Sequence, residues 1–155
     1  MGIEIERKFL LRDARWRAEV SHAVRMCQGY LASRPECSVR VRIEGEDARL
    51  NIKSATLGIE RREFEYAIPR ADAELMLAEL CGGHTLSKTR HYVPRGGHVF
   101  EIDEFDGANA GLVVAEVELA HADETFERPD WLGEEVSHDR RYYNVCLLER
   151  PYICW

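Results

Sequence analysis

The chain has 155 residues, of which 45% are hydrophobic and 32% charged, so it can form one domain with a substantial core but hardly two. Its formal net charge of −7 argues against a broad nucleic-acid-binding surface, and no run of about 18 apolar residues predicts a membrane span. The five cysteines are odd in number and never spaced as CxxC, which argues against a disulfide framework and a structural zinc site. The first residues are acidic where a secretory signal is basic and then apolar, so we expect a cytoplasmic protein without nucleic-acid or membrane partners.

Alternation of apolar and polar residues, typical of strands with one buried face, recurs along most of the chain. Eight strands are predicted, mostly antiparallel because short turns join them, at Gly2–Leu10, Val24–Ser33, Cys37–Glu44, Ala48–Ser54, Glu60–Ile68, Thr85–Val93, His98–Phe105 and Leu112–Ala120. The best internal helix is expected at Ala71–Leu80, a helical or irregular stretch at Asp13–Ala23, a short helix at His121–Phe126 and a terminal helix at Asp139–Leu148. With no linker or repeat visible, the prediction is a single α+β domain over residues 1–155.

Like charges recur two residues apart on the same face of several predicted strands. The pairs are Glu4 with Glu6, Arg40 with Arg42, Glu63 with Glu65, Lys88 with Arg90, Glu101 with Asp103, and Glu116 with Glu118. Neighbours of one sign repel each other, so a sheet with an ordinary solvated face would favour mixed signs. Carboxylate pairs can bind a multivalent cation and cation pairs can bind a polyphosphate, which together suit a metal-phosphate complex. If the strands close into a barrel with these faces inward, the interior is a charged tunnel and the apolar outer faces need helices to cover them.

Other devices for phosphate binding and hydrolysis are missing from the sequence. It contains no GxxxxGK[ST] or GxGxxG loop, no HxH or HExxH metal motif and no GxSxG nucleophile motif. Side chains would therefore hold the phosphate, and the expected nucleophile is water. Of the 21 basic residues 18 are arginine, so the positions of the three lysines, Lys8, Lys53 and Lys88, are informative.

The opening Glu4-Ile5-Glu6-Arg7-Lys8 resembles the ExExK signature of the CYTH domains, also called triphosphate tunnel metalloenzymes. The resemblance extends over nearly the whole chain through Gln28-Gly29-Tyr30-Leu31, Arg40-Val41-Arg42, Asn51-Ile52-Lys53-Ser54, Arg61-Arg62-Glu63-Phe64-Glu65, Lys88-Thr89-Arg90, Glu101-Ile102-Asp103, Glu116-Val117-Glu118 and Asp139-Arg140-Arg141-Tyr142-Tyr143-Asn144. This ordered set is most similar to the short bacterial, tripolyphosphatase-like branch. It implies an eight-stranded antiparallel barrel closed into a tunnel with a charged interior, surrounded by helices, with the C-terminal helix near one mouth.

The resemblance also implies roles for individual residues. Metal ligands, for Mg²⁺ or Mn²⁺, would be Glu4, Glu6, Glu101, Asp103, Glu116 and Glu118. Phosphoryl oxygens would be bound by Arg40, Arg42, Lys53, Arg61, Lys88, Arg90 and Arg140. Lys8 and Tyr30 resemble a pair that orients or activates water, while Glu63 and Glu65 are interpreted as partners of tunnel arginines. Because Glu4 and Glu6 would keep Lys8 protonated unless metals neutralise them, activation of the water by metal carries at least equal weight.

The function implied is metal-dependent hydrolysis of inorganic triphosphate to diphosphate and phosphate. Related tunnels cyclise ATP, as class IV adenylate cyclases do, or hydrolyse thiamine or nucleoside triphosphates, so these reactions remain alternatives. A non-enzymatic polyphosphate- or nucleotide-binding sensor is the third hypothesis, although a pure anion binder gains nothing from carboxylates beside phosphates. The expected partner is a small-molecule triphosphate, and a homodimer is left open.

Overall fold

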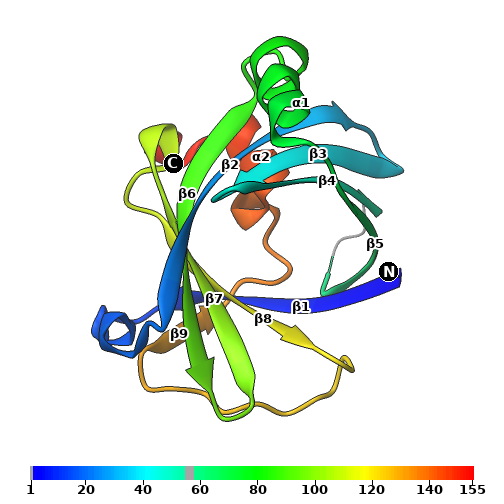
Figure 1. The fold of residues 1–155 in the computed structure, drawn as a ribbon. Helices are drawn as coiled ribbons and strands as arrows, with labels where there is room; N and C mark the ends of the chain where they lie inside the picture. Colours follow the sequence, from blue (N-terminus) through cyan, green and yellow to red (C-terminus); the bar gives the residue numbers. More distant parts are fainter. Residues whose placement is uncertain (1, 55–57) are drawn as a thin grey trace.

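The chain folds into a β-barrel, seen in a computed structural model that describes residues 2–54 and 58–155 (Figure 1). The strands are β1 (Gly2–Leu11), β2 (His22–Ser33), β3 (Cys37–Glu44), β4 (Asp47–Ser54), β5 (Glu60–Ala67), β6 (Thr85–Arg95), β7 (His98–Phe105), β8 (Val113–Leu119) and β9 (Leu132–Glu135). They follow the order β5-β4-β3-β2-β6-β7-β8-β1, and β5 then pairs with β1 to close the ring. Each of these pairings is antiparallel. The predicted closed eight-stranded antiparallel barrel is therefore confirmed.

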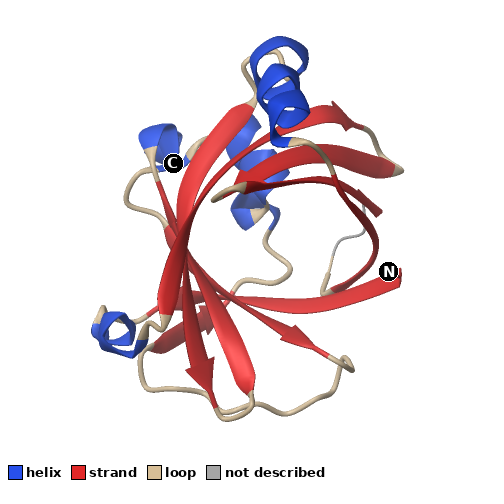
Figure 2. Ribbon diagram, in the orientation of Figure 1, coloured by secondary structure: helices blue, strands red, loops and turns tan. Residues whose placement is uncertain are grey.

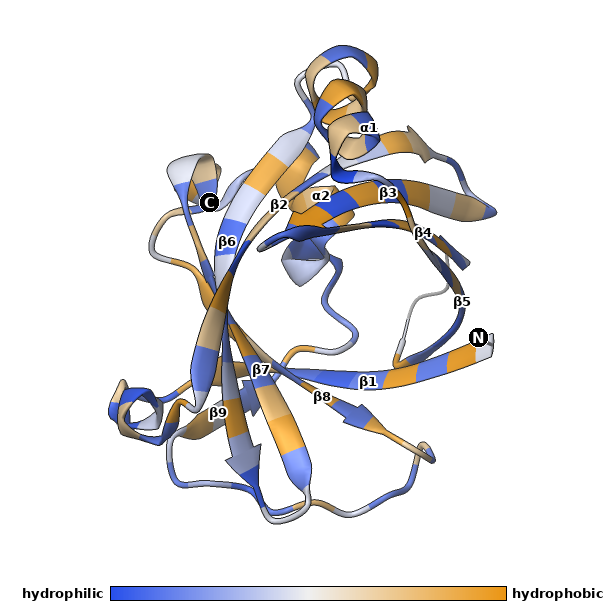
Figure 3. Cartoon of the chain, in the orientation of Figure 1, coloured by the Kyte–Doolittle hydropathy of each residue, from blue (hydrophilic) through white to orange (hydrophobic). Residues whose placement is uncertain are grey.

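The register of the strands turns the charged faces toward the barrel axis. Glu6 lies opposite Glu118 and Lys8 opposite Glu116 on the paired strands β1 and β8, so these side chains share one face. Figure 3 shows the alternation of hydrophilic and hydrophobic residues along β1. The apolar residues between the charged ones point outward and need cover from the rest of the chain.

One outer face is covered by a helix, α1 (Arg70–Leu75), which continues as a π-helical turn over Met76–Leu80. Ala73 packs there against Val41 and Ile43 of β3. Gly29 of β2 permits the close approach, because a Cβ at this position would lie 2.7 Å from Cys81 Sγ.

The outer face of β1, β7 and β8 is covered mainly without helices (Figure 2). Trp16, in a 3-10 turn at Arg15–Glu19, and Trp131 pack in the same core cluster as Phe9 and Phe100. The strand β9 was not predicted, and it pairs with the end of β1. Two expectations are corrected here: His121–Phe126 is not a helix, and helices do not surround the barrel. The cover comes instead from β9, the 3-10 turn and irregular chain.

The C-terminal segment packs at one end of the barrel, as predicted, but it is not the single helix expected at Asp139–Leu148. A 3-10 turn at Arg140–Tyr142, capped by the Asp139 side chain, is followed by Tyr143 in extended conformation and then by α2 (Asn144–Glu149). The Asp139 carboxylate accepts from the Arg141 backbone N–H at 3.0 Å and caps the start of this turn, and the turn ends where Tyr143 adopts φ −73° and ψ 134°. Further 3-10 turns lie at Gly107–Asn109 and Tyr152–Cys154.

At that same end the barrel interior is apolar rather than charged. Leu147 of α2 packs with Leu86, Phe105 and Val114. Phe105 lies opposite Lys88, so it shares the inner face with that lysine. The barrel thus contains an apolar plug at one end and a charged compartment beside it. None of the helices in the described ranges is long and apolar enough to cross a membrane.

Candidate active site

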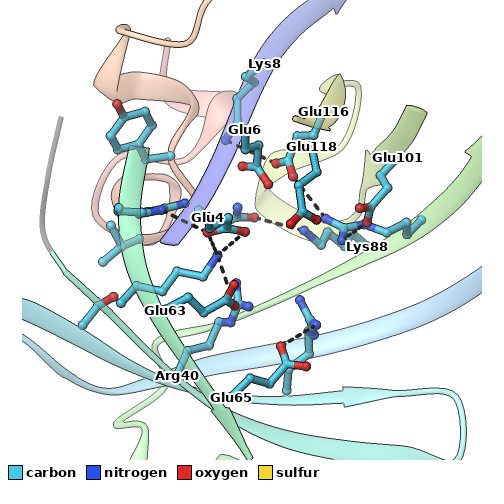
Figure 4. A pocket seen from close by; sticks show the side chains of 18 of the residues that line it. Glu4, Glu6, Lys8, Arg40, Glu63, Glu65, Lys88, Glu101, Glu116 and Glu118 are labelled. Carbon is cyan, nitrogen blue, oxygen red and sulfur yellow. Dashed lines mark hydrogen bonds and ion pairs between the residues drawn. The ribbon is translucent and has the colours of Figure 1, made fainter. Parts of the chain in front are cut away.

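The charged compartment contains a cavity of about 280 Å³, shown from close by in Figure 4. Its lining includes seven basic and eight acidic side chains, together with Tyr30, Tyr92 and Tyr143. The basic residues are Lys8, Arg40, Arg42, Lys53, Arg61, Lys88 and Arg90, and the acidic ones are Glu4, Glu6, Glu44, Glu63, Glu65, Glu101, Glu116 and Glu118. A cavity with this many fixed charges of both signs suits a ligand that is itself highly charged.

Five of these carboxylates lie on the neighbouring strands β1, β8 and β7 and form an acidic wall: Glu4, Glu6, Glu101, Glu116 and Glu118. Burial, together with the nearby charges of Glu116 and Glu4, raises the pKa of Glu6 to about 8. Glu6 also hydrogen bonds to Glu116, whose pKa stays well below its ordinary value because Lys8 and the neighbouring cations outweigh its burial. Burial raises the pKa of Glu101 and of Glu118 as well. Burial therefore disfavours the charged form of Glu6, Glu101 and Glu118 in the ligand-free protein.

The cations come mainly from β3, β4 and β6 and face the acidic wall. Lys53 Nζ lies 2.9 Å from Glu4 Oε2, and Arg61 Nε lies 3.5 Å from the same oxygen. Burial would raise the pKa of Glu4, but Lys53 and Arg61 outweigh it and leave the pKa lowered. Burial lowers the pKa of Lys53, and Arg40 and Arg61 add to this effect. Several cations therefore lack full compensation and can accept a polyanion.

Lys88 and Arg90 are held by a buried carboxylate behind them. Lys88 Nζ lies 2.6 Å from Asp103 Oδ2, and Arg90 donates to both oxygens of Asp103, from Nε at 2.7 Å and from Nη2 at 2.9 Å. Lys88 and Asp103 are each 1% exposed. Burial lowers the pKa of Lys88 to about 8, against the opposing charge of Asp103.

The expected ligand set is therefore only partly assembled around the cavity. Asp103 does not line it, and both of its oxygens are engaged by Lys88 and Arg90, so its expected role as a metal ligand stays a prediction. Arg140 is exposed and lies instead in an outer groove with Glu134 and Asp139, so the structure does not bring it to the cavity. The other residues expected to bind metal or phosphate all line the cavity.

Lys8 and Tyr30 both line the cavity, but no hydrogen bond joins them in the part of the chain that the structure describes. Lys8 Nζ donates to the Tyr142 carbonyl at 3.1 Å and lies 3.4 Å from Glu116 Oε1. Two acceptors therefore face this amine, which suits a role as a hydrogen-bond donor to an oxygen.

Glu63 and Glu65 are interpreted as partners of tunnel arginines; in the structure Glu65 contacts an arginine and Glu63 contacts a lysine. Glu63 lies 3.7 Å from Lys53 Nζ, and Glu65 lies 3.9 Å from Arg42 Nη2. Asn51 was not predicted at the site, and its amide donates to Glu63 at 3.1 Å and to Glu65 at 2.6 Å.

Other residues that line the cavity were not predicted, because they do not belong to the pairs of like charges along the strands. They are Ser38, Glu44, Gly58, Tyr92, Ser137, Tyr143, Asn144 and Val145. Tyr143 is the best placed of them, because its hydroxyl donates to the Ser137 carbonyl at 3.0 Å and its ring lies 5.5 Å from Lys8 Nζ. The extended Tyr143 that breaks the predicted helix therefore forms part of the cavity wall.

The acidic wall has the chemistry of a site for a hard divalent cation. In the described residues, no three acidic, histidine or cysteine side chains converge closely enough to hold a metal as they stand. The donors are nevertheless carboxylates of adjacent strands, with Glu6 directly opposite Glu118. The raised pKa values of both carboxyls mark a place where an added positive charge would be stabilised. Glu4, Glu6, Glu116 and Glu118 therefore fit a divalent cation.

Comparison with known proteins places the chain among relatives with the same length and architecture. A CYTH domain family model matches residues 2–143. An inorganic triphosphatase of Acetivibrio thermocellus is 40% identical over 152 residues, which cover 98% of this chain and 97% of that protein. One of Nitrosomonas europaea is 38% identical over 149 residues, covering 93% and 95%. The crystal structure of an inorganic triphosphatase is 36% identical and superposes with a TM-score of 0.67, covering 94% of this chain and 93% of that one. This chain belongs to the CYTH domain family.

Proposed function

We propose that this protein hydrolyses inorganic triphosphate to diphosphate and phosphate inside the barrel, with Mg²⁺ or Mn²⁺ as cofactor. The observation that carries the proposal is the cavity in which a wall of carboxylates faces a wall of lysines and arginines. The relatives named inorganic triphosphatase, 38% and 40% identical over nearly the whole chain, support the same reaction.

The lysines and arginines of β3, β4 and β6 that face the acidic wall form a cationic wall, which would bind the phosphoryl oxygens. Arginine guanidinium groups donate two hydrogen bonds in a plane that matches two phosphoryl oxygens, and lysines add point charges. Arg40, Arg42 and Arg90 would serve in the first way, and Lys53 and Lys88 in the second. Lys53 releases Glu4 when it turns to phosphate, because the carboxylate now at 2.9 Å competes for the same ammonium. Substrate binding thus frees an acidic ligand as it occupies a cation.

The acidic wall holds the metal. Glu4, Glu6, Glu116 and Glu118 would ligate it, and Glu6 must lose its proton first because burial raises its pKa to about 8. When bound, the divalent cation neutralises phosphoryl charge and lowers the pKa of a water molecule that attacks phosphorus. Lys8 orients an oxygen at the end of the cavity through its ammonium, and Tyr30 stands as its proposed partner.

Phosphate release from a substrate panel tests the proposal. The panel contains tripolyphosphate, ATP, thiamine triphosphate and diphosphate, each with Mg²⁺, with Mn²⁺ and with EDTA. We expect release from tripolyphosphate to exceed release from every other substrate and to stop in EDTA. Undiminished release in EDTA, or a strong preference for ATP or thiamine triphosphate, would contradict the proposal and favour one of the related reactions. Tight binding of tripolyphosphate without turnover would favour the sensor hypothesis.

A further inference from the structure

A buried carboxamide next to the cationic wall lacks hydrogen-bond partners. Gln28 of β2 is 0% exposed, and within the residues that the structure describes neither its Oε1 nor its Nε2 has a partner. Burying an amide without partners costs about 1 to 3 kcal/mol, so such a group is rare unless another state of the protein uses it.

The register places this carboxamide among the groups that would bind phosphate. Gln28 lies directly opposite Arg42 of β3 on one side and Leu86 of β6 on the other. Residues directly opposite each other share one face of a sheet, and Arg42 lines the cavity. Gln28 itself does not line the cavity, so its side chain lies on the inner face beneath the lining side chains.

Arg42 has an unused donor that matches the unused acceptor of Gln28. In the described part of the chain its buried Nε makes no hydrogen bond. Its Nη2 has only distant acidic neighbours, Glu44 at 3.4 Å and Glu65 at 3.9 Å. Glu44 is already bonded by Arg49 at 2.7 Å. Arg42 is thus only weakly fixed in the ligand-free state, although a phosphate ligand needs its guanidinium in one orientation.

We propose that Gln28 is a positioning residue that acts through Arg42, an inference that rests on the proposed function. When a triphosphate draws the Arg42 guanidinium into the cavity, Gln28 Oε1 accepts the Nε hydrogen and fixes the plane of the two Nη groups toward the phosphoryl oxygens. Gln28 Oε1 and Arg42 Nε, each without a partner among the described residues of the ligand-free protein, thereby become partners of each other in the bound state.

The test uses Gln28→Met, which keeps the length of the side chain and removes both polar atoms. Met26→Leu is the matched control, because Met26 is buried on the same face of the same strand, two residues away. Both variants are assayed for tripolyphosphate hydrolysis and for thermal unfolding without ligand. Each is also combined with Arg42→Lys, which keeps the positive charge but has no Nε donor.

We expect Gln28→Met to unfold at the same temperature as the wild type or higher, since no buried amide is left unpaired. Its KM for tripolyphosphate should rise about tenfold or more, with kcat changed much less, as for the loss of one charged hydrogen bond. In the Arg42→Lys background the same substitution should change KM less than about twofold, because its target is gone. Met26→Leu should match the wild type in both assays.

Two results would overturn the inference. One is a KM for Gln28→Met within about twofold of the wild type, and the other is that the effects of Gln28→Met and Arg42→Lys multiply as for independent sites. A wild-type protein that neither binds nor hydrolyses tripolyphosphate would instead refute the proposed function, and the inference about Gln28 would fall with it.

Discussion

Asp103→Asn should cost the protein much of its stability and change the pH dependence of its activity. The substitution keeps the shape of the side chain but removes the charge that pairs Lys88 and Arg90, through contacts of 2.6 to 2.9 Å in a site that is 1% exposed. Removing one partner from a buried ion pair costs about 3 to 5 kcal/mol. Glu101 and Glu116 stay beside Arg90, so we expect the lower end, about 3 kcal/mol.

Thermal and urea unfolding measure this loss, and a decrease of about 6 to 12 °C in Tm corresponds to about 3 kcal/mol for a chain of this size. Activity adds a second readout. Burial lowers the pKa of Lys88 to about 8 and Asp103 opposes that shift, so Asp103→Asn lowers the pKa further. Lys88 then loses its charge at a lower pH, and kcat/KM should fall with rising pH earlier than in the wild type.

Asp106→Asn is the control, because Asp106 pairs with Arg25 at an exposed site and the pair should contribute less than about 1 kcal/mol. If Asp103→Asn were as stable as the wild type and kept its pH profile, the role assigned to Asp103 behind the cationic wall would be wrong.

Two further predictions concern the outside of the barrel. The Arg7 guanidinium, 2.5 Å from Glu135 and hydrogen bonded to it, holds the pKa of that carboxyl at about 2 instead of 4.5. This stabilisation is complete above about pH 4.5 and is lost as the pH falls through about 2. Glu135→Gln should therefore cost about 1 kcal/mol in urea unfolding at pH 7 and much less near pH 2, and an equal cost at both pH values would contradict the assignment. Gly29→Ala would place a Cβ 2.7 Å from Cys81 Sγ and 3.0 Å from Leu77, so it should lower stability by about 1 to 3 kcal/mol. Adding Cys81→Ala to Gly29→Ala should restore part of the lost stability. If it restores none, the steric strain does not come from the contact with Cys81.

The barrel and most of the cavity could be predicted because side chains along a strand alternate between its two faces with a period of two residues. Alternation along each strand indicates the two faces, and charges at i,i+2, such as Arg40 with Arg42, mark a face that ordinary solvation does not explain. The resemblance to a known family then supplied the closed ring. The chain's single-domain organisation, oligomeric state and compartment stay predictions.

Features that depend on tertiary contacts could not be predicted. The four residues of β9, Leu132–Glu135, do not alternate, and they form a strand because the end of β1 offers a free edge. The alternation also places Glu101 and Asp103 on one face, but it does not indicate how deeply each side chain is buried. Only the packed barrel shows that Glu101 reaches the cavity while Asp103 lies behind two cations. At the break, the Tyr143 hydroxyl accepts from the Gly58 N–H and donates to the Ser137 carbonyl, and helix propensity does not report such long-range contacts.

If the carboxylates of the acidic wall serve a bound metal and not the fold, Glu6→Gln should remove activity and leave the protein folded. Burial raises the pKa of Glu6 to about 8, so at pH 7 the ligand-free protein already holds this carboxyl protonated, and glutamine reproduces that neutral form. The decisive measurement is the rate of phosphate release from tripolyphosphate with Mg²⁺, taken beside a thermal melt of the same sample. We predict a Tm within about 3 °C of the wild type and a rate at least about a hundredfold lower, since an amide cannot supply the charge that the cation needs. Wild-type turnover by Glu6→Gln would show that this carboxylate is not needed for catalysis. A loss of folding that accounts for the lost activity would show that it serves the fold.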